Sequence, residues 1–122
     1  MNNLLNYLNH HKSKDFNEVL FSYIDKSGYS DSEIYKKADI DRKLFSKIRC
    51  NNNYIPRKKV IIKLGIALEL DKNNFKKLLK SAGYSLTDNN NRDLIISYCL
   101  ENNIYDLYTI NDYLYNYART VL

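Results

Sequence analysis

The spacing of apolar residues along the chain predicts a series of short helices. Between residues 16 and 83, apolar side chains recur three and four positions apart in five successive segments, which is typical of helices that bury one face. These predicted helices span about residues 16–26, 30–38, 41–49, 56–68 and 71–82. The links between them are short, and the chain has only three Gly and one Pro. We therefore expect an all-α bundle of five helices in residues 15–83.

Polar residues at the segment ends support these boundaries. Side chains that cap helix N-termini well lie at Asp15, Ser30, Asp41 and Asp71. Glu33 follows Ser30 at the spacing of a capping box. Between the second and third helices, Asp39 can adopt the left-handed backbone of a tight turn. Gly28 and Gly83 are suited to end the first and the fifth helix.

Residues 84–122 form a C-terminal extension with a different character. A helix is predicted from about Asn89 to Glu101, and a last helix after Thr109. The apolar residues expected to face inward are Leu94, Ile95 and Tyr98 in the first of these helices and Ile110 and Leu114 in the second. We expect this two-helix extension to pack on the five-helix domain.

Residues 1–14 are expected to be an arm or a short helix. Leu4, Leu5 and Leu8 give this segment some amphipathic character, and His10 and His11 are adjacent. Neighbouring residues point to different sides of a helix, so this His pair is not expected to share a metal ion.

Composition narrows the classes of function. No apolar run approaches the length of a membrane span, and the N-terminus lacks the pattern of a signal peptide, so we expect a cytoplasmic protein with no membrane partner. Cys50 and Cys99 match no metal or redox spacing and are expected to be reduced thiols. The chain has no glycine-rich phosphate loop and no metal-binding motif. We therefore expect no enzyme activity, no cofactor and no metal.

Charge is divided unevenly along the chain. Residues 84–122 carry a net charge of −3 and residues 1–83 a net charge of +8, out of a total of +5. Residues 42–63 include eight Lys or Arg and no Asp or Glu. At about 100° per residue, the helix at 41–49 turns Leu44, Phe45 and Ile48 to one side and only polar or cationic residues to the other. A purely cationic face repels itself, and an anionic partner would relieve that repulsion.

The second and third helices with their turn have the order of a helix-turn-helix, in which the second helix enters the major groove of DNA. Three long donors on the third helix are expected to reach base edges: Arg42, Lys43 and Lys47. A second set is placed to meet phosphates: Ser46, Arg49, Asn51, Asn52, Arg57 and Lys58. A merely solvated Lys-rich surface, or an RNA or protein partner, are the alternatives for this face.

Residues 30–70, SDSEIYKKADIDRKLFSKIRCNNNYIPRKKVIIKLGIALEL, resemble the DNA-binding domains of lambda-repressor-type (XRE-like) regulators. With the first and fifth helices, the resemblance covers about residues 16–83. It implies a five-helix domain of bacterial or phage type that binds operator DNA, commonly as a dimer, with base-reading positions at Arg42, Lys43 and Lys47. Asp31 differs from the family, because it places a negative charge where a residue that contacts phosphate is common.

The extension, including GYSLTDNNNRDLIISYCLENNIYDLYTINDYL, is similar to one associated with small standalone bacterial proteins of this type and with macro-domain proteins. Seven of the twelve Tyr lie between residues 84 and 117. Tyr is favoured at interfaces, and the candidates for a homodimer or partner surface are Tyr108, Tyr113, Tyr115 and Tyr117.

Two functions follow from these patterns. The leading one is sequence-specific binding of double-stranded DNA by a small transcriptional regulator. The alternative is a protein-interaction module, an adaptor or antitoxin-like partner, that uses the Tyr-rich extension.

Overall fold

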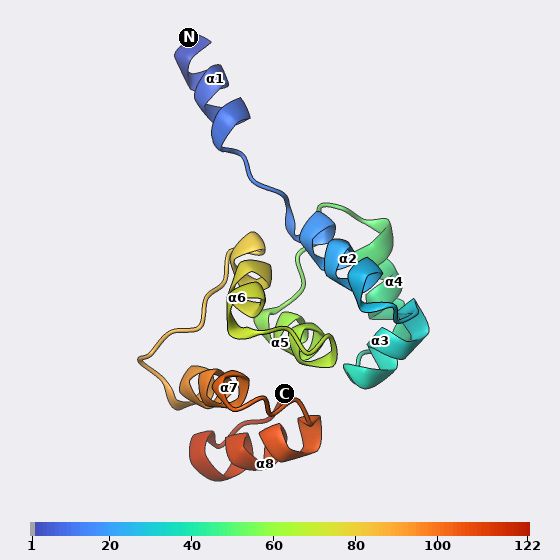
Figure 1. The fold of residues 1–122 in the computed structure, drawn as a ribbon, viewed down its shortest axis with the longest axis vertical. Helices are drawn as coiled ribbons and strands as arrows, with labels where there is room; N and C mark the ends of the chain where they lie inside the picture. The colour runs from blue at the N-terminus through green and yellow to red at the C-terminus, as the bar shows by residue number, and fades with distance from the viewer. Residues whose placement is uncertain (1) are drawn as a thin grey trace.

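A computed structural model describes residues 2–122, and this part of the chain folds entirely into α-helices and connecting segments (Figure 1). The helices are α1 (Asn2–His11), α2 (Phe16–Ser27), α3 (Asp31–Lys37), α4 (Arg42–Cys50), α5 (Lys58–Ala67), α6 (Lys72–Ser81), α7 (Asn91–Glu101) and α8 (Leu107–Ala118). The predicted all-α class is confirmed.

The predicted capping residues begin their helices as expected. Ser30 accepts a hydrogen bond from the Glu33 backbone N–H, and the Glu33 carboxylate accepts one from the Ser30 N–H, which completes the capping box of α3. Asp41 caps α4 by accepting from the Lys43 N–H. Asp39 in the turn between α3 and α4 has a left-handed backbone, with φ of 54°. These local signals fix the short spacing of α3 and α4.

Three predicted helix starts differ from the structure. The fourth predicted helix was expected to begin at Pro56, but α5 begins at Lys58 because Arg57 is still extended, with ψ of 154°. α7 begins after Asn90, whose side chain accepts from the Asp93 N–H. α8 begins at Leu107, before Thr109, because Asp106 accepts from both the backbone N–H and the hydroxyl of Thr109.

Helix α5 is the centre of the core. Six of its ten residues are buried: Ile61, Ile62, Leu64, Gly65, Ile66 and Ala67. α5 packs against α3 and α6, and α6 also packs against α2. A Cβ atom at Gly65 would lie 2.5 Å from the Phe75 ring, so the close approach of α5 and α6 requires glycine at this position. The body of the protein is thus built around one mostly buried helix.

The C-terminal extension joins this body through α7, which packs against α6 and α8. Ile96, Cys99 and Leu100 of α7 are buried in the same core as Ile110 and Leu114 of α8. The hydroxyl of Tyr105 donates to the Leu70 carbonyl oxygen at 2.7 Å.

The predicted inward face of α7 was wrong. Leu94 and Tyr98 are 45% and 54% exposed, and Ile95 is only half-buried. The buried side instead runs through Asp93 and Ile96, since the neighbouring helices cover that side. The inward positions predicted for α8 are confirmed, because Ile110 and Leu114 are both fully buried.

Helix α1 extends away from the rest of the molecule (Figure 1). None of its residues is buried, and the apolar side chains of Leu4, Leu5, Tyr7 and Leu8 are each more than half exposed. The expected arm or short helix at the N-terminus is therefore a ten-residue helix that leaves its apolar side uncovered.

Candidate nucleic-acid interface

The inner side of α4 is fixed by apolar packing. Phe45 and Ile48 are buried, and the Phe45 ring contacts those of Phe21 and Tyr35 at centroid distances of 6.0 and 5.8 Å. The Asn17 side-chain amide donates to the Ile48 carbonyl oxygen at 2.9 Å. These contacts set the rotation of α4 about its own axis.

That rotation turns the predicted polar face of α4 to solvent. Its exposed residues are Arg42, Lys43, Ser46, Lys47 and Arg49. We call this surface the α4 face. The Lys47 ammonium lies 4.3 Å from the centroid of the Tyr54 ring, which orients that side chain over the loop after α4. The α4 face groups cations without an acidic residue on the helix itself.

Arg49 at the end of the α4 face is already paired. Its Nε and Nη2 atoms lie 2.5 and 2.7 Å from the two carboxylate oxygens of Asp31, and its guanidinium lies 4.0 Å from the Phe21 ring centroid. This bidentate pair neutralises Asp31, the residue whose negative charge was expected to disfavour a phosphate contact. Arg49 thus holds α4 against α3 in addition to contributing to the surface.

The loop after α4 adds polar groups beside the α4 face. Asn51, Asn52 and Arg57 are exposed, and the Asn51 side chain accepts a hydrogen bond from the Asn53 N–H at 3.0 Å. Of the predicted phosphate-contacting residues, Ser46, Asn51, Asn52 and Arg57 therefore lie on the surface, and the Arg57 guanidinium has no ion-pair partner in residues 2–122.

Lys58 has a different environment from the other predicted phosphate contacts. Its ammonium lies 2.7 Å from Oδ2 of Asp93, a carboxylate that is fully buried in α7. Asp93 also accepts from the backbone N–H and the hydroxyl of Thr87, at 2.9 and 3.0 Å. Burial alone would raise the pKa of Asp93, but the hydrogen bonds from Lys58 and Thr87 and the charge of Lys58 hold it below its usual value. Lys58 therefore ties α5 to the C-terminal extension.

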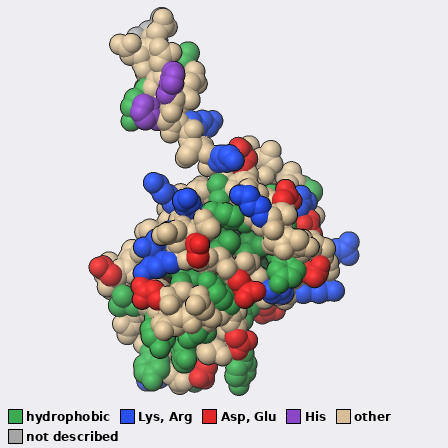
Figure 2. All heavy atoms as spheres, viewed as in Figure 1, with side chains coloured by type: hydrophobic (Ala, Val, Ile, Leu, Met, Phe, Trp, Pro, Cys, Tyr) green, Lys and Arg blue, Asp and Glu red, His purple; other side chains and the backbone are tan. Residues whose placement is uncertain are grey.

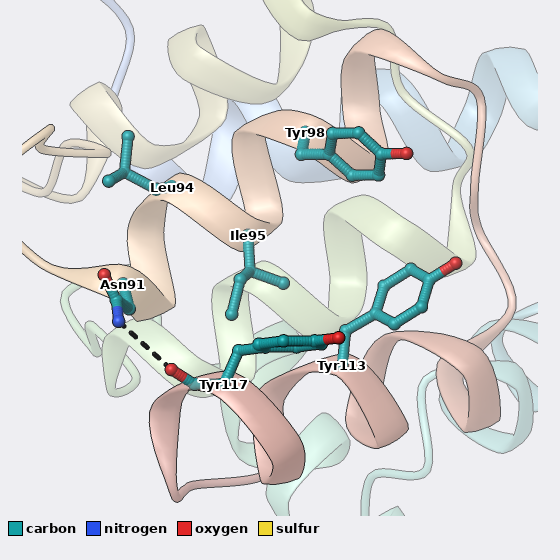
Figure 3. Close-up of a pocket in the computed structure, with 6 residues that line it drawn as sticks. All are labelled: Asn91, Leu94, Ile95, Tyr98, Tyr113 and Tyr117. Carbon is teal, nitrogen blue, oxygen red and sulfur yellow. Dashed lines mark hydrogen bonds between the residues drawn. The ribbon is translucent and has the colours of Figure 1, made fainter.

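The predicted tyrosine surface is largely exposed. Tyr108, Tyr115 and Tyr117 are 84%, 65% and 70% exposed, whereas Tyr113 is half-buried beside an open groove between α7 and α8. The groove has a volume of about 520 Å³ and is lined by Asn91, Leu94, Ile95, Tyr98, Tyr113 and Tyr117 (Figure 3). We call it the tail groove. The Asn91 amide donates to the Tyr117 carbonyl oxygen at 3.1 Å and closes one end.

Sequence reasoning missed both Asp93 and the tail groove. The groups that donate hydrogen bonds to the Asp93 carboxylate lie 6 and 35 residues away, so no local pattern marks it. One feature of the sequence could have indicated the groove. Helix α7 carries apolar residues on two sides, and a helix with apolar residues on more than one side is usually buried on each of them.

The cysteines and the possible metal ligands form no further candidate site in residues 2–122. Cys50 is exposed and Cys99 is buried, and burial raises the pKa of the Cys99 thiol. Within residues 2–122, no three His, Cys, Asp or Glu side chains are grouped to hold a metal ion. No helix in that range is long and apolar enough to cross a membrane.

The chain matches no protein-family model, no curated protein and no solved structure in the comparisons made.

Proposed function

We propose that this protein binds double-stranded DNA through the α4 face and acts as a small transcriptional regulator in the cytoplasm, as a binding protein and not as an enzyme. The observation that carries the proposal is the exposure of Arg42, Lys43 and Lys47 on one side of a helix whose other side is buried. In this proposal α3 and α4 are the two helices of a lambda-repressor-like helix-turn-helix, and α2, α5 and α6 support them.

In the proposed mode of binding, attraction between the cations and the phosphates supplies most of the affinity, and contacts with the bases supply the sequence preference. Arg42, Lys43 and Lys47 reach base edges in the major groove. Ser46, Arg49, Asn51, Asn52 and Arg57 contact the phosphates on either side. We leave Lys58 out of this set, because its ammonium is held by the buried Asp93. Arg49 can donate to a phosphate only with the nitrogen atoms that Asp31 does not occupy.

A charge-matched pair of variants tests the proposal. Fluorescence anisotropy of a labelled random duplex is measured at about 50 and about 200 mM salt, where phosphate contacts dominate. We expect wild-type binding to weaken steeply with salt, and Arg42→Ala/Lys47→Ala to lower the affinity and to reduce the salt slope by about 2, since the variant loses two cations that contact the duplex. Lys77→Ala/Lys80→Ala removes the same charge from exposed positions on α6. Equal losses in the two variants would contradict a specific role for the α4 face.

The tail groove favours a second candidate function, a protein-interaction module of adaptor or antitoxin-like type. The groove and its exposed tyrosines give an apolar surface with polar tips. Partner binding that survives Lys47→Ala and is lost with Tyr113→Ala would support this function over DNA binding.

A further inference from the structure

Helix α1 has an amphipathic pattern that nothing in its own chain covers. At about 100° per residue, its apolar residues Leu4, Leu5, Tyr7 and Leu8 fall within about 160°, and its Asn residues occupy the other side. Isolated helices shorter than about 12–15 residues are marginal in water, so a ten-residue helix needs packing to persist. Figure 2 shows hydrophobic side chains on α1, which stands clear of the body of the molecule.

The tail groove is a matching uncovered surface. Leu94, Tyr98 and Tyr117 are exposed along it, and Ile95 and Tyr113 form its half-buried floor. Four of its six lining residues are exposed, so it is an open trough and not an enclosed cavity. A trough between two helices suits the apolar side of a third helix, which inserts side chains spaced three and four residues apart.

The net charges of the two segments are opposite. Lys12 and Lys14 follow α1 directly and are exposed, and no acidic residue lies in residues 2–14. The extension that forms the groove carries a net charge of −3, and its exposed Asp88 and Asp112 have no ion-pair partner in residues 2–122. Cations also lie nearby, with Arg92 and Arg119 beside Asn91 and Tyr117, and Lys72 and Lys76 beside Leu94 and Tyr98. In Figure 2, hydrophobic and acidic side chains gather at the end of the molecule that holds α7 and α8.

We propose that α1 of one copy docks, with its Leu4, Leu5 and Leu8 side, into the tail groove of a second copy, which docks its own α1 in return. Figure 1 places α1 and α8 at opposite ends of the molecule. The link between His11 at the end of α1 and Phe16 at the start of α2 spans at most about 18 Å, and Phe16 is fixed in the core. The link therefore favours the groove of another chain. Two reciprocal contacts make a closed two-fold dimer with no free end.

Sedimentation equilibrium of the full chain between about 1 μM and 1 mM, the range of weak to moderate interfaces, tests this proposal. We expect a species of twice the 14.5 kDa chain mass. Leu4→Asp/Leu8→Asp in α1 and Leu94→Asp/Tyr98→Asp in the groove should each weaken dimerisation by at least about 100-fold, because each loses buried apolar side chains. All four residues are exposed within one chain, and circular dichroism checks that each variant keeps α2–α8 folded.

Mixing the two variants provides the decisive observation. The α1 variant retains an intact groove and the groove variant retains an intact α1, so the mixture should regain dimers through one of the two contacts. Asn3→Asp on α1 and Tyr108→Asp outside the groove are controls that should leave the dimer unchanged.

Three results would overturn the proposal. A wild-type chain that stays monomeric up to about 1 mM lacks the dimer altogether. Loss of dimers in the α1 variant alone, with the groove variant unaffected, would mean that α1 pairs with another α1. Binding of wild type, but not of the α1 variant, to anionic lipid vesicles without dimerisation would assign α1 to a membrane surface.

Discussion

Helices α4 and α7 both divide into a side that packs inward and a side that faces solvent, but their outer sides differ in chemistry. α4 turns cations outward, and α7 turns Leu94 and Tyr98 outward. The polar outer side of α4 made its inner side evident from the sequence. The two apolar sides of α7 did not reveal which one was the core. The comparison indicates that a cationic outer side and an apolar outer side leave opposite marks in a sequence.

The largest expected effect comes from shortening one side chain on each side of α7, which tests which side packs inward. Ile96 is 1% exposed and Leu94 is 45% exposed. We expect Ile96→Ala to lower the free energy of unfolding by about 3 kcal/mol, and Leu94→Ala by less than about 1 kcal/mol. Urea unfolding followed by circular dichroism, at concentrations where the chain is monomeric, measures both. Losses of similar size would show that the assigned inner side of α7 is wrong.

A second test separates two neighbouring lysines that the sequence cannot distinguish. Lys58 is paired with buried Asp93, whereas Lys59 is exposed. We expect Lys58→Gln to cost about 2 kcal/mol of stability, because the buried carboxylate of Asp93 loses its closer cation and keeps only Arg92, whose Nε lies 3.5 Å from Oδ1. Lys59→Gln should stay within about 0.5 kcal/mol of wild type. If Lys58→Gln instead leaves stability intact and weakens DNA binding, the phosphate role predicted for Lys58 would be reinstated.

Acid should weaken the link between α5 and α7. The pKa of Asp93 is lower in the folded chain than the usual value, so its ion pair with Lys58 stabilises the fold fully above the unfolded pKa of about 3.9. This contribution is lost as pH falls from there through the folded pKa. We expect the stability difference between wild type and Asp93→Asn to be constant from about pH 7 to pH 5 and to shrink below about pH 4. A difference that grows on acidification would have the wrong sign for this mechanism.

The smallest predicted effects concern the N-terminal caps of the two helices. Asn90 accepts from the Asp93 N–H at 2.8 Å, and Asp41 accepts from the Lys43 N–H at the longer distance of 3.3 Å. Replacing either residue with Ala should cost about 1 kcal/mol, with the larger loss for Asn90→Ala. Thermal unfolding of both variants ranks them, and the opposite order would indicate that Asp41 acts mainly through its charge near the helix N-terminus.

Most of the fold of residues 15–83 could be predicted, because its signals are local. Ser30 with Glu33, Asp39 in its left-handed turn, and Asp41 each act within a few residues of their own position. The start of α5 was placed two residues early, because proline suits a first helical turn but does not require one there.

The candidate sites were harder to predict, since they depend on contacts distant in the sequence. The orientation of Arg42 and Lys47 followed from Phe45 and Ile48, which share their helix. The Lys58 pair with Asp93 spans 35 residues, and the tail groove combines side chains from two helices. Neither feature has a periodic signature, and only the folded chain brings their parts together.

Amide chemical-shift changes on titration with a DNA duplex test the central claim most directly. We predict that the changes concentrate on α4 and residues 51–57 and leave Leu94, Tyr98 and the rest of α7 and α8 unaltered. Changes that concentrate on α7 and α8, or that spread evenly over the lysines of α6 and α4, would contradict the assignment of the anionic partner to the α4 face.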